Sequence, residues 1–205
     1  MSLLASRADF EPANPTEGAT ALYYQPADGS GYRVDFPFFQ TRVDNLKTLY
    51  PPTGQTLAIW GCGFGATVNL AQQAGYNAYG FDASSYAITR GKALIPAIAA
   101  RLFVRDALVS QQVSAARGDA GLKGQTKFAL VVTEDMLTCM SNTEISTALP
   151  LLRGIVASGP LLHVLTVLDP TVPTRDARLN WKTPAQWKPL LTPDRCFDTV
   201  AHQEF

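Results

Sequence analysis

The stretch TLAIWGCGFGATVNLAQQAGYNAYGFD, residues 56–82, decides how the rest of the chain can be organised. It begins with a short, β-prone apolar run, Thr56 to Trp60, and glycines then alternate with other residues over 61–65. Residues 66–74 follow with a helical pattern, and a second apolar run ends at Asp82. The pattern predicts strand, glycine turn, helix and strand, with a carboxylate where the second strand ends.

The glycines at 61, 63 and 65 indicate what this turn must do. A chain that passes from a strand into a helix within a few residues needs backbone angles that most side chains resist. Glycine adopts them, and its missing Cβ lets a ligand touch the main chain. Asp82 follows the first glycine by about 20 residues, the spacing at which a carboxylate can accept hydrogen bonds from a ribose. Residues 56–82 therefore predict a site for an adenosine-containing cofactor.

The glycine spacing separates two kinds of cofactor site. The dinucleotide fingerprint is G-x-G-x-x-G, whereas residues 61–65 read G-C-G-F-G, which is one residue tighter. This loop resembles that of class I S-adenosylmethionine-dependent methyltransferases, usually written E/D-x-G-x-G-x-G. The chain departs from that pattern at Ile59, where the family usually has an acidic residue that contacts the methionine amino group. A nicotinamide-dependent oxidoreductase is disfavoured by the spacing and by the absence of a recognisable second domain.

Length and composition narrow the class of protein. The 205 residues suffice for one α/β domain, and 46% hydrophobic with 17% charged residues is typical of a folded chain. The formal net charge of zero argues against strong general nucleic-acid binding. No apolar run approaches the roughly 20 residues of a membrane span, so no membrane contact is expected. Cys62, Cys139 and Cys196 are odd in number and form no C-x-x-C pair, which favours a cytoplasmic protein with neither disulfide nor metal.

The chain divides into an arm and a domain. Residues 1–31 are rich in Pro, Gly, Asp and Ala and predict an irregular N-terminal arm. Its aromatic residues either pack the arm onto the domain or make it a lid over the cofactor. Residues 32–205 are predicted to form a single domain, which opens with a helix whose apolar residues recur from Phe39 to Tyr50.

Strand and helix patterns alternate from residue 56 to residue 168, which predicts a parallel sheet with right-handed crossovers. After the first β–α–β unit we expect strands at 101–104, 128–132 and 161–168 and helices that begin near Ser84, Val113 and Ser141. Pro150 is expected to kink the last of these helices or divide it into two pieces. His163, inside a strand, is expected to be a packed core residue. Ligands of such sheets lie beyond the C-terminal strand ends, where the polar signals of this chain converge.

The resemblance to class I methyltransferases covers residues 36–168 and implies a Rossmann-like, mostly parallel, doubly wound sheet. It also implies that the chain is too short for the family's usual antiparallel pair of last strands. We expect one helix near Thr183 and one strand near Cys196 to Val200, hence a shortened pair. A sheet trimmed in this way would favour a homodimer.

The resemblance also implies the cofactor, S-adenosylmethionine, and its contacts. The glycine loop would pass beneath the methionine part, Asp82 would bind the ribose, and Asp106 would accept from the adenine amino group. The segment 133–137 matches a pocket-lining S-x-D-x-L-x-H motif, with Cys139 in place of the final histidine. The predicted cofactor-binding residues are Gly61, Cys62, Gly63, Phe64, Gly65, Asp82, Ala83, Ser84, Asp106, Ala107, Glu134, Asp135, Met136 and Leu137.

The predicted function is in-line methyl transfer to an unidentified O, N or C acceptor, either a small molecule or a tRNA-type substrate. Thr133 to Leu137 lack the N/D-P-P-Y/F motif that grips an amino nitrogen, and no Pro-Cys pair marks a cytosine-C5 methylase. No catalytic residue is assigned. The chain resembles small phage and bacterial methyltransferases. The alternative is a non-catalytic module of the same fold that senses or sequesters the cofactor.

Overall fold

A parallel sheet forms the centre of the part of the chain that this computed structural model describes, residues 37–124, 126–157, 161–165, 180, 182–192 and 194–198. Its strands are β1 (Thr56–Trp60), β2 (Asn77–Asp82), β3 (Leu102–Val104), β4 (Leu130–Glu134), β5 (Leu161–Leu165) and β6 (Arg195–Asp198). They lie in the order β3-β2-β1-β4-β5-β6, and every pair is parallel. The predicted doubly wound α/β fold is confirmed, and the predicted N-terminal arm lies outside the described residues.

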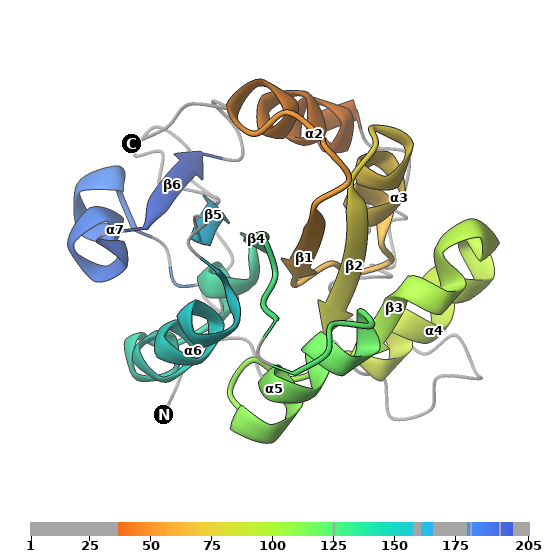
Figure 1. Cartoon of the computed structure of the whole chain (residues 1–205). Coiled ribbons are helices and arrows are strands. Elements are labelled where there is room, and N and C mark those ends of the chain that lie inside the picture. The colour runs from red at the N-terminus through yellow and green to blue at the C-terminus, as the bar shows by residue number, and fades with distance from the viewer. Residues whose placement is uncertain are drawn as a thin grey trace, which may run out of the picture.

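Helices connect the strands and cover both faces of the sheet (Figure 1). They are α2 (Pro37–Leu49), α3 (Ala66–Gln73), α4 (Ser85–Leu94), α5 (Ser110–Asp119), α6 (Asn142–Ile155) and α7 (Pro184–Leu191), with the 3₁₀ helices η1 (Pro96–Arg101) and η2 (Met136–Cys139). The predicted starts at Ser84 and Ser141 are confirmed, whereas the helix predicted near Val113 begins at Ser110. Ser84 accepts a hydrogen bond from the Ala87 N–H, and Ser141 forms a capping box with Glu144. None of the described helices is long and apolar enough to cross a membrane.

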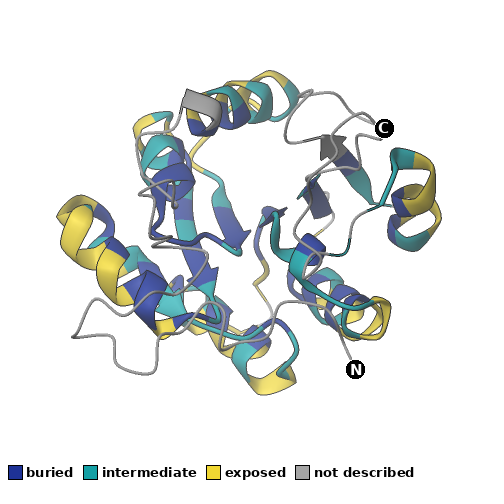
Figure 2. Cartoon of the chain, turned by 180° about the vertical axis from the view of Figure 1, so that it is seen from behind, coloured by how far each residue is buried: buried dark blue, intermediate teal, exposed yellow. Residues whose placement is uncertain are grey.

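Each strand contributes alternate residues to two separate cores. In β1, Leu57 and Ile59 pack toward α2 and α3, whereas Ala58 and Trp60 pack toward α5, α6 and α7. All four are buried, since the strand lies inside the sheet with helices on both sides (Figure 2). A residue's position in the strand therefore decides which layer of helices it meets.

Three sequence predictions need correction or completion. The strand predicted at 128–132 is β4, and it ends two residues later, so Glu134 is a strand residue and does not follow the strand. α6 runs through Pro150 as one helix, so of the two predicted alternatives, a kink or a division, the division into two pieces is wrong. The strand expected near Cys196 is β6, which pairs directly with β5 in the parallel sense. Residues 166–168 and 199–205, where further strand was expected, lie outside the described residues.

Candidate functional site

The glycine loop after β1 has the backbone that its sequence predicts. Gly61, Gly63 and Gly65 all have positive φ angles, of 77°, 54° and 85°. A Cβ on Gly61 would lie 2.7 Å from the carbonyl oxygen of Glu134 and 2.8 Å from the Met136 Cβ. The loop therefore packs against the end of β4, and a larger residue at 61 would push the two apart.

The Asp82 carboxylate connects this loop to the start of α4 by two hydrogen bonds. Its Oδ2 accepts a hydrogen bond from the Gly63 N–H at 2.9 Å, and its Oδ1 accepts from the Ser84 N–H at 2.9 Å. The predicted glycine loop, the carboxylate at the end of β2 and the following Ala83–Ser84 segment thus meet at one edge of the sheet. This is the C-terminal edge, where parallel α/β sheets bind ligands.

Asp106 lies at the same edge, beyond β3. Val104 is paired with Asp82 across the two strands, and the Arg105 N–H donates to the Asp82 carbonyl oxygen at 2.9 Å. The Asp106 Oδ1 accepts from the Leu108 N–H, and the Asp106 N–H donates to the Gln112 side chain. These bonds form the turn into α5 and fix the Asp106 carboxylate just beyond the end of β3.

The end of β4 carries the most charged part of the site. Asp135 has a φ angle of 49°, and it alone among the described residues other than glycine has a positive φ. This left-handed conformation costs about 1–2 kcal/mol and turns the chain directly from β4 into η2. The turn places the side chains of Glu134 and Asp135 on either side of one cation.

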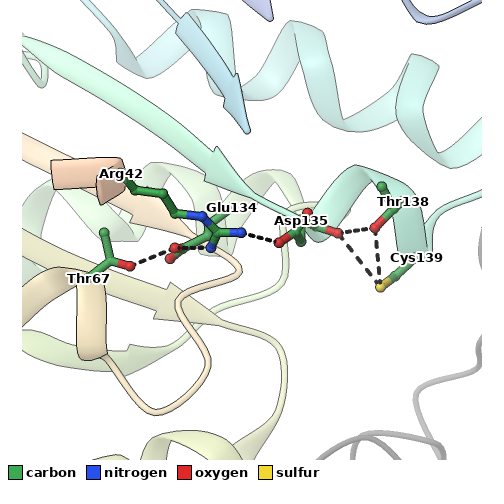
Figure 3. A network of polar contacts seen from close by, with 6 residues as sticks. All are labelled: Arg42, Thr67, Glu134, Asp135, Thr138 and Cys139. Carbon is green, nitrogen blue, oxygen red and sulfur yellow. Dashed lines mark hydrogen bonds and ion pairs between the residues drawn. The ribbon is translucent and has the colours of Figure 1, made fainter. Parts of the chain in front are cut away.

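That cation is Arg42, from the middle of α2 (Figure 3). Its Nη1 donates to the Glu134 Oε1 at 2.5 Å, and its Nη2 donates to the Asp135 Oδ2 at 2.6 Å. Thr67, in the first turn of α3, also donates to the Glu134 Oε1 at 2.6 Å. The Arg42 and Glu134 side chains are only 6% and 5% exposed. The network therefore joins α2, α3 and β4 away from solvent.

Burial and pairing change the pKa values of these groups. Burial raises the pKa of Glu134 above its ordinary value, although Arg42 and Thr67 oppose the shift. For Arg42, burial acts to lower the pKa, but the two carboxylates outweigh it and the pKa is raised. Arg42 therefore stays protonated, whereas burial acts against the charge on Glu134.

Comparisons with solved structures identify proteins that have a similar fold. No protein-family model matches the sequence, and no curated protein matches it. Among solved structures, magnesium protoporphyrin IX methyltransferase (ChlM) from Synechocystis PCC 6803 with bound SAM has a TM-score of 0.53 at 18% identity over 75% of this chain and 67% of that one. The same enzyme with bound SAH gives 0.54 at 17% identity, over 75% and 71%. The CcbJ methyltransferase from Streptomyces caelestis gives 0.50 at 14% identity, over 68% of this chain and 52% of that one.

The chain has the class I methyltransferase fold. At these identities the likeness is one of fold.

Within this methyltransferase fold, four of the predicted cofactor-binding residues have side chains inside a core. Cys62 packs with the residues beneath α2 and α3, and burial raises the pKa of its thiol well above the ordinary value. Ala107 and Leu137 belong to the opposite core. Phe64 is 5% exposed and makes an edge contact with Tyr86. These positions could meet a ligand only through their main chain as the structure stands.

His163 has a structural role in this methyltransferase fold, as its place inside a strand predicted. It is fully buried; its Nδ1 lies 2.8 Å from the Thr133 hydroxyl, and its Nε2 lies 3.0 Å from the Asp194 Oδ2. Asp194 also pairs with Arg153 of α6. Burial lowers the pKa of His163. The order Thr133, His163, Asp194 resembles a hydrolase triad, but Thr133 is also 0% exposed and cannot face a substrate. These hydrogen bonds instead connect β4, β5 and α6 to the start of β6.

Sequence reasoning missed Arg42 and Thr67. Arg42 lies three residues after Phe39 and four before Leu46, so helical spacing puts it on the apolar face of α2. A charged residue on a face that must be buried signals a partner, and that signal was in the sequence. Nothing in the sequence identifies the partner as Glu134. Among the described residues, no group of three or more His, Cys, Asp or Glu side chains could hold a metal ion.

Proposed function

We propose that this chain is an S-adenosylmethionine-dependent methyltransferase that transfers a methyl group to an O, N or C atom of a small molecule or a tRNA-type substrate. The proposal depends most on the hydrogen bond from the Gly63 N–H to the Asp82 Oδ2. This bond brings the glycine loop and the β2 carboxylate together at the edge where ligands of such sheets bind. The fold of solved methyltransferases, one of them with bound SAM, supports the same conclusion.

The residues at this edge fit the parts of the cofactor. Gly63 has a positive φ and no Cβ, so the loop can offer its main chain to the methionine part at this position. Each Asp82 oxygen has more than one acceptor site, so the carboxylate can hold the loop and still accept from ribose hydroxyls. Asp106 would accept from the adenine amino group. Residues 134–137 would face the methionine part.

Methyl transfer requires the protein mainly to orient the acceptor atom and the methyl group in line. When bound, the cofactor supplies a methyl group that its sulfonium already activates. Holding two reacting atoms in line can contribute about 7–11 kcal/mol, whereas a positioned base contributes about 10²–10⁴-fold in rate. A site held by Asp82 and by the Arg42 network can therefore work without a histidine at position 139.

Cofactor binding is the first test of the proposal. Titration calorimetry with S-adenosylhomocysteine should show saturable binding, and NAD should show none. Asp82→Ala should weaken binding by about 1.5–3 kcal/mol, because it removes charge-assisted hydrogen bonds to the ribose. Asp44→Ala, on the exposed side of α2, is the matched control and should change nothing. Equal affinity of the Asp82→Ala variant and the native protein would show that the ribose lies elsewhere.

Turnover is the second test. A labelled methyl donor should transfer label to one pool among tRNA, DNA and small-molecule extract. Labelled product from any pool removes the non-catalytic alternative. Saturable binding of S-adenosylhomocysteine without product from any pool would instead favour a module that senses or sequesters the cofactor.

A further inference from the structure

A cavity of about 50 Å³ lies between α2 and the sheet. Its floor includes Ile59, Val132 and Leu162, which are paired in register across β1, β4 and β5. Val164, paired with Glu134, forms the next layer toward the C-terminal edge. α2 covers the cavity with Leu46 and Leu49 and adds the polar side chains of Arg42 and Asn45. The described lining residues are Arg42, Asn45, Leu46, Leu49, Ile59, Thr67, Val132, Glu134, Leu162 and Val164.

One end of this cavity is polar, and it is the end nearest the glycine loop. Glu134 lines the cavity, and its own carbonyl oxygen lies 2.7 Å from the place that a Cβ of Gly61 would take. Arg42 and Thr67 both donate to the Glu134 Oε1 (Figure 3). The Glu134 Oε2 is buried and has no hydrogen-bond partner among the described residues. A buried carboxylate oxygen without a donor is costly, so this atom indicates that a donor from a ligand belongs there.

The charges at this end favour a cation. Arg42 carries one positive charge, and it contacts the two carboxylates of Glu134 and Asp135. The three groups therefore have one negative charge in excess, and among the described residues that line the cavity Arg42 alone is cationic. The raised pKa of Glu134, which is caused by its burial, agrees with a carboxylate that lacks full compensation. Apart from Asn45 of α2 the remaining wall is apolar, and the volume admits roughly three to five non-hydrogen atoms.

We propose that this cavity binds a compact aliphatic amine, with the ammonium group on the Glu134 Oε2 and the hydrocarbon part against Ile59, Val132 and Leu162. An ammonium supplies the donor that the Glu134 Oε2 lacks and a charge opposite to that of the carboxylate, and a short alkyl chain matches the apolar part of the wall. The amine is then also the class of methyl acceptor: the Glu134 carboxylate would take one proton from the ammonium, the freed nitrogen lone pair would form the bond to the methyl carbon, and the bond from that carbon to the sulfonium sulfur would break. That second statement rests on the proposed function, whereas the binding itself does not.

The test uses n-butylammonium as the probe, with n-butanol and butyrate for comparison. Titration of the full chain, followed by backbone amide chemical shifts of α2, should show saturable binding in the order butylammonium, butanol, butyrate. Glu134→Gln should weaken butylammonium binding by about tenfold to a hundredfold, the effect of losing one charged hydrogen bond. Glu144→Gln is the matched control, because glutamine also completes the capping box of α6, and it should leave binding unchanged.

A second variant covers the case in which Glu134→Gln fails to fold. Leu46→Phe fills the cavity from α2 and should abolish butylammonium binding without changing the affinity for S-adenosylhomocysteine. Binding of butyrate as tightly as butylammonium, or butylammonium binding that survives Leu46→Phe, overturns the amine site. Absence of S-adenosylhomocysteine binding in the native protein overturns the proposed function instead, and leaves a saturable amine site standing.

Discussion

Removal of Arg42 tests whether the network at the end of β4 holds the fold together. Arg42→Met keeps an unbranched apolar stem and removes the guanidinium, which leaves Glu134, only 5% exposed, with Thr67 as its remaining donor from the network. Breaking a buried ion pair by removing one partner typically costs about 3–5 kcal/mol. Since small domains have about 5–15 kcal/mol of stability in total, the variant should fold but unfold at a much lower urea concentration.

The double variant Arg42→Met/Glu134→Met makes the prediction specific. It removes the stranded charge together with its partner, and a buried pair replaced by apolar residues of similar size is often no less stable than the original. Two bonds are still lost: the bond to Asp135, whose side chain is 22% exposed and can be hydrated, and the bond from the buried Thr67 hydroxyl to Glu134. We expect the double variant to lose about 1–3 kcal/mol, less than the Arg42→Met single variant.

The assay is urea unfolding of four proteins: the native protein, the single variants Arg42→Met and Glu134→Met, and the double variant. The midpoint and the slope of the transition are fitted for each. Lys47→Met is the matched control in the same helix, because Lys47 is 45% exposed and meets Asp44 only at 3.8 Å. Its effect should stay below about 0.5 kcal/mol. If the losses from Arg42→Met and Glu134→Met simply add in the double variant, the two residues are not coupled, and the site described above is not a network.

Two further predictions concern the packing and the pH dependence of the fold. Gly91→Ala should destabilise the protein by about 1–3 kcal/mol, because the new Cβ would lie 2.5 Å from the main-chain oxygen of Phe64. Gly118→Ala, in α5 with nothing within 4 Å of its Cβ position, should instead stabilise by about 0.5–1 kcal/mol, and equal thermal shifts for the two variants would contradict this account. His163 has a lowered pKa in the folded state, so the unfolded chain binds the proton first and stability should fall as the pH drops from about 7.5 toward 5. His163→Gln should flatten the dependence of the unfolding free energy on pH, measured by urea titrations at several pH values. An unchanged dependence would assign the effect to other groups. The lowered pKa of Asp194 also makes stability fall with decreasing pH, but at more acidic pH.

Local patterns account for most of what the sequence predicted correctly. The β–α–β unit from β1 to β2, the three positive φ angles of the glycine loop and the caps at Ser84 and Ser141 all appear in the structure. Each depends on interactions within a few residues, such as a side-chain oxygen that accepts a nearby N–H. Such features can be deduced from composition and spacing alone.

The end of β4 is a feature that local sequence patterns did not predict correctly. An apolar run predicted a strand end at Val132, but pairing with β1 and β5 continues the strand to Glu134. This continuation turns the Glu134 side chain toward α2, onto the same face as Val132. The parallel pairing of β6 with β5 was equally hidden, because strand direction depends on the path of the connection between them.

The sequence by itself determined that the chain forms a parallel α/β sheet whose glycine loop and acidic strand end lie at one edge, because period, capping and glycine placement act over short distances along the chain. Only the tertiary structure decided that Arg42 meets Glu134, 92 residues away, and that a cavity with a buried carboxylate oxygen lies beneath α2. Contacts of this kind depend on strand register and on how a helix packs across the sheet, and no interaction between neighbouring residues specifies either.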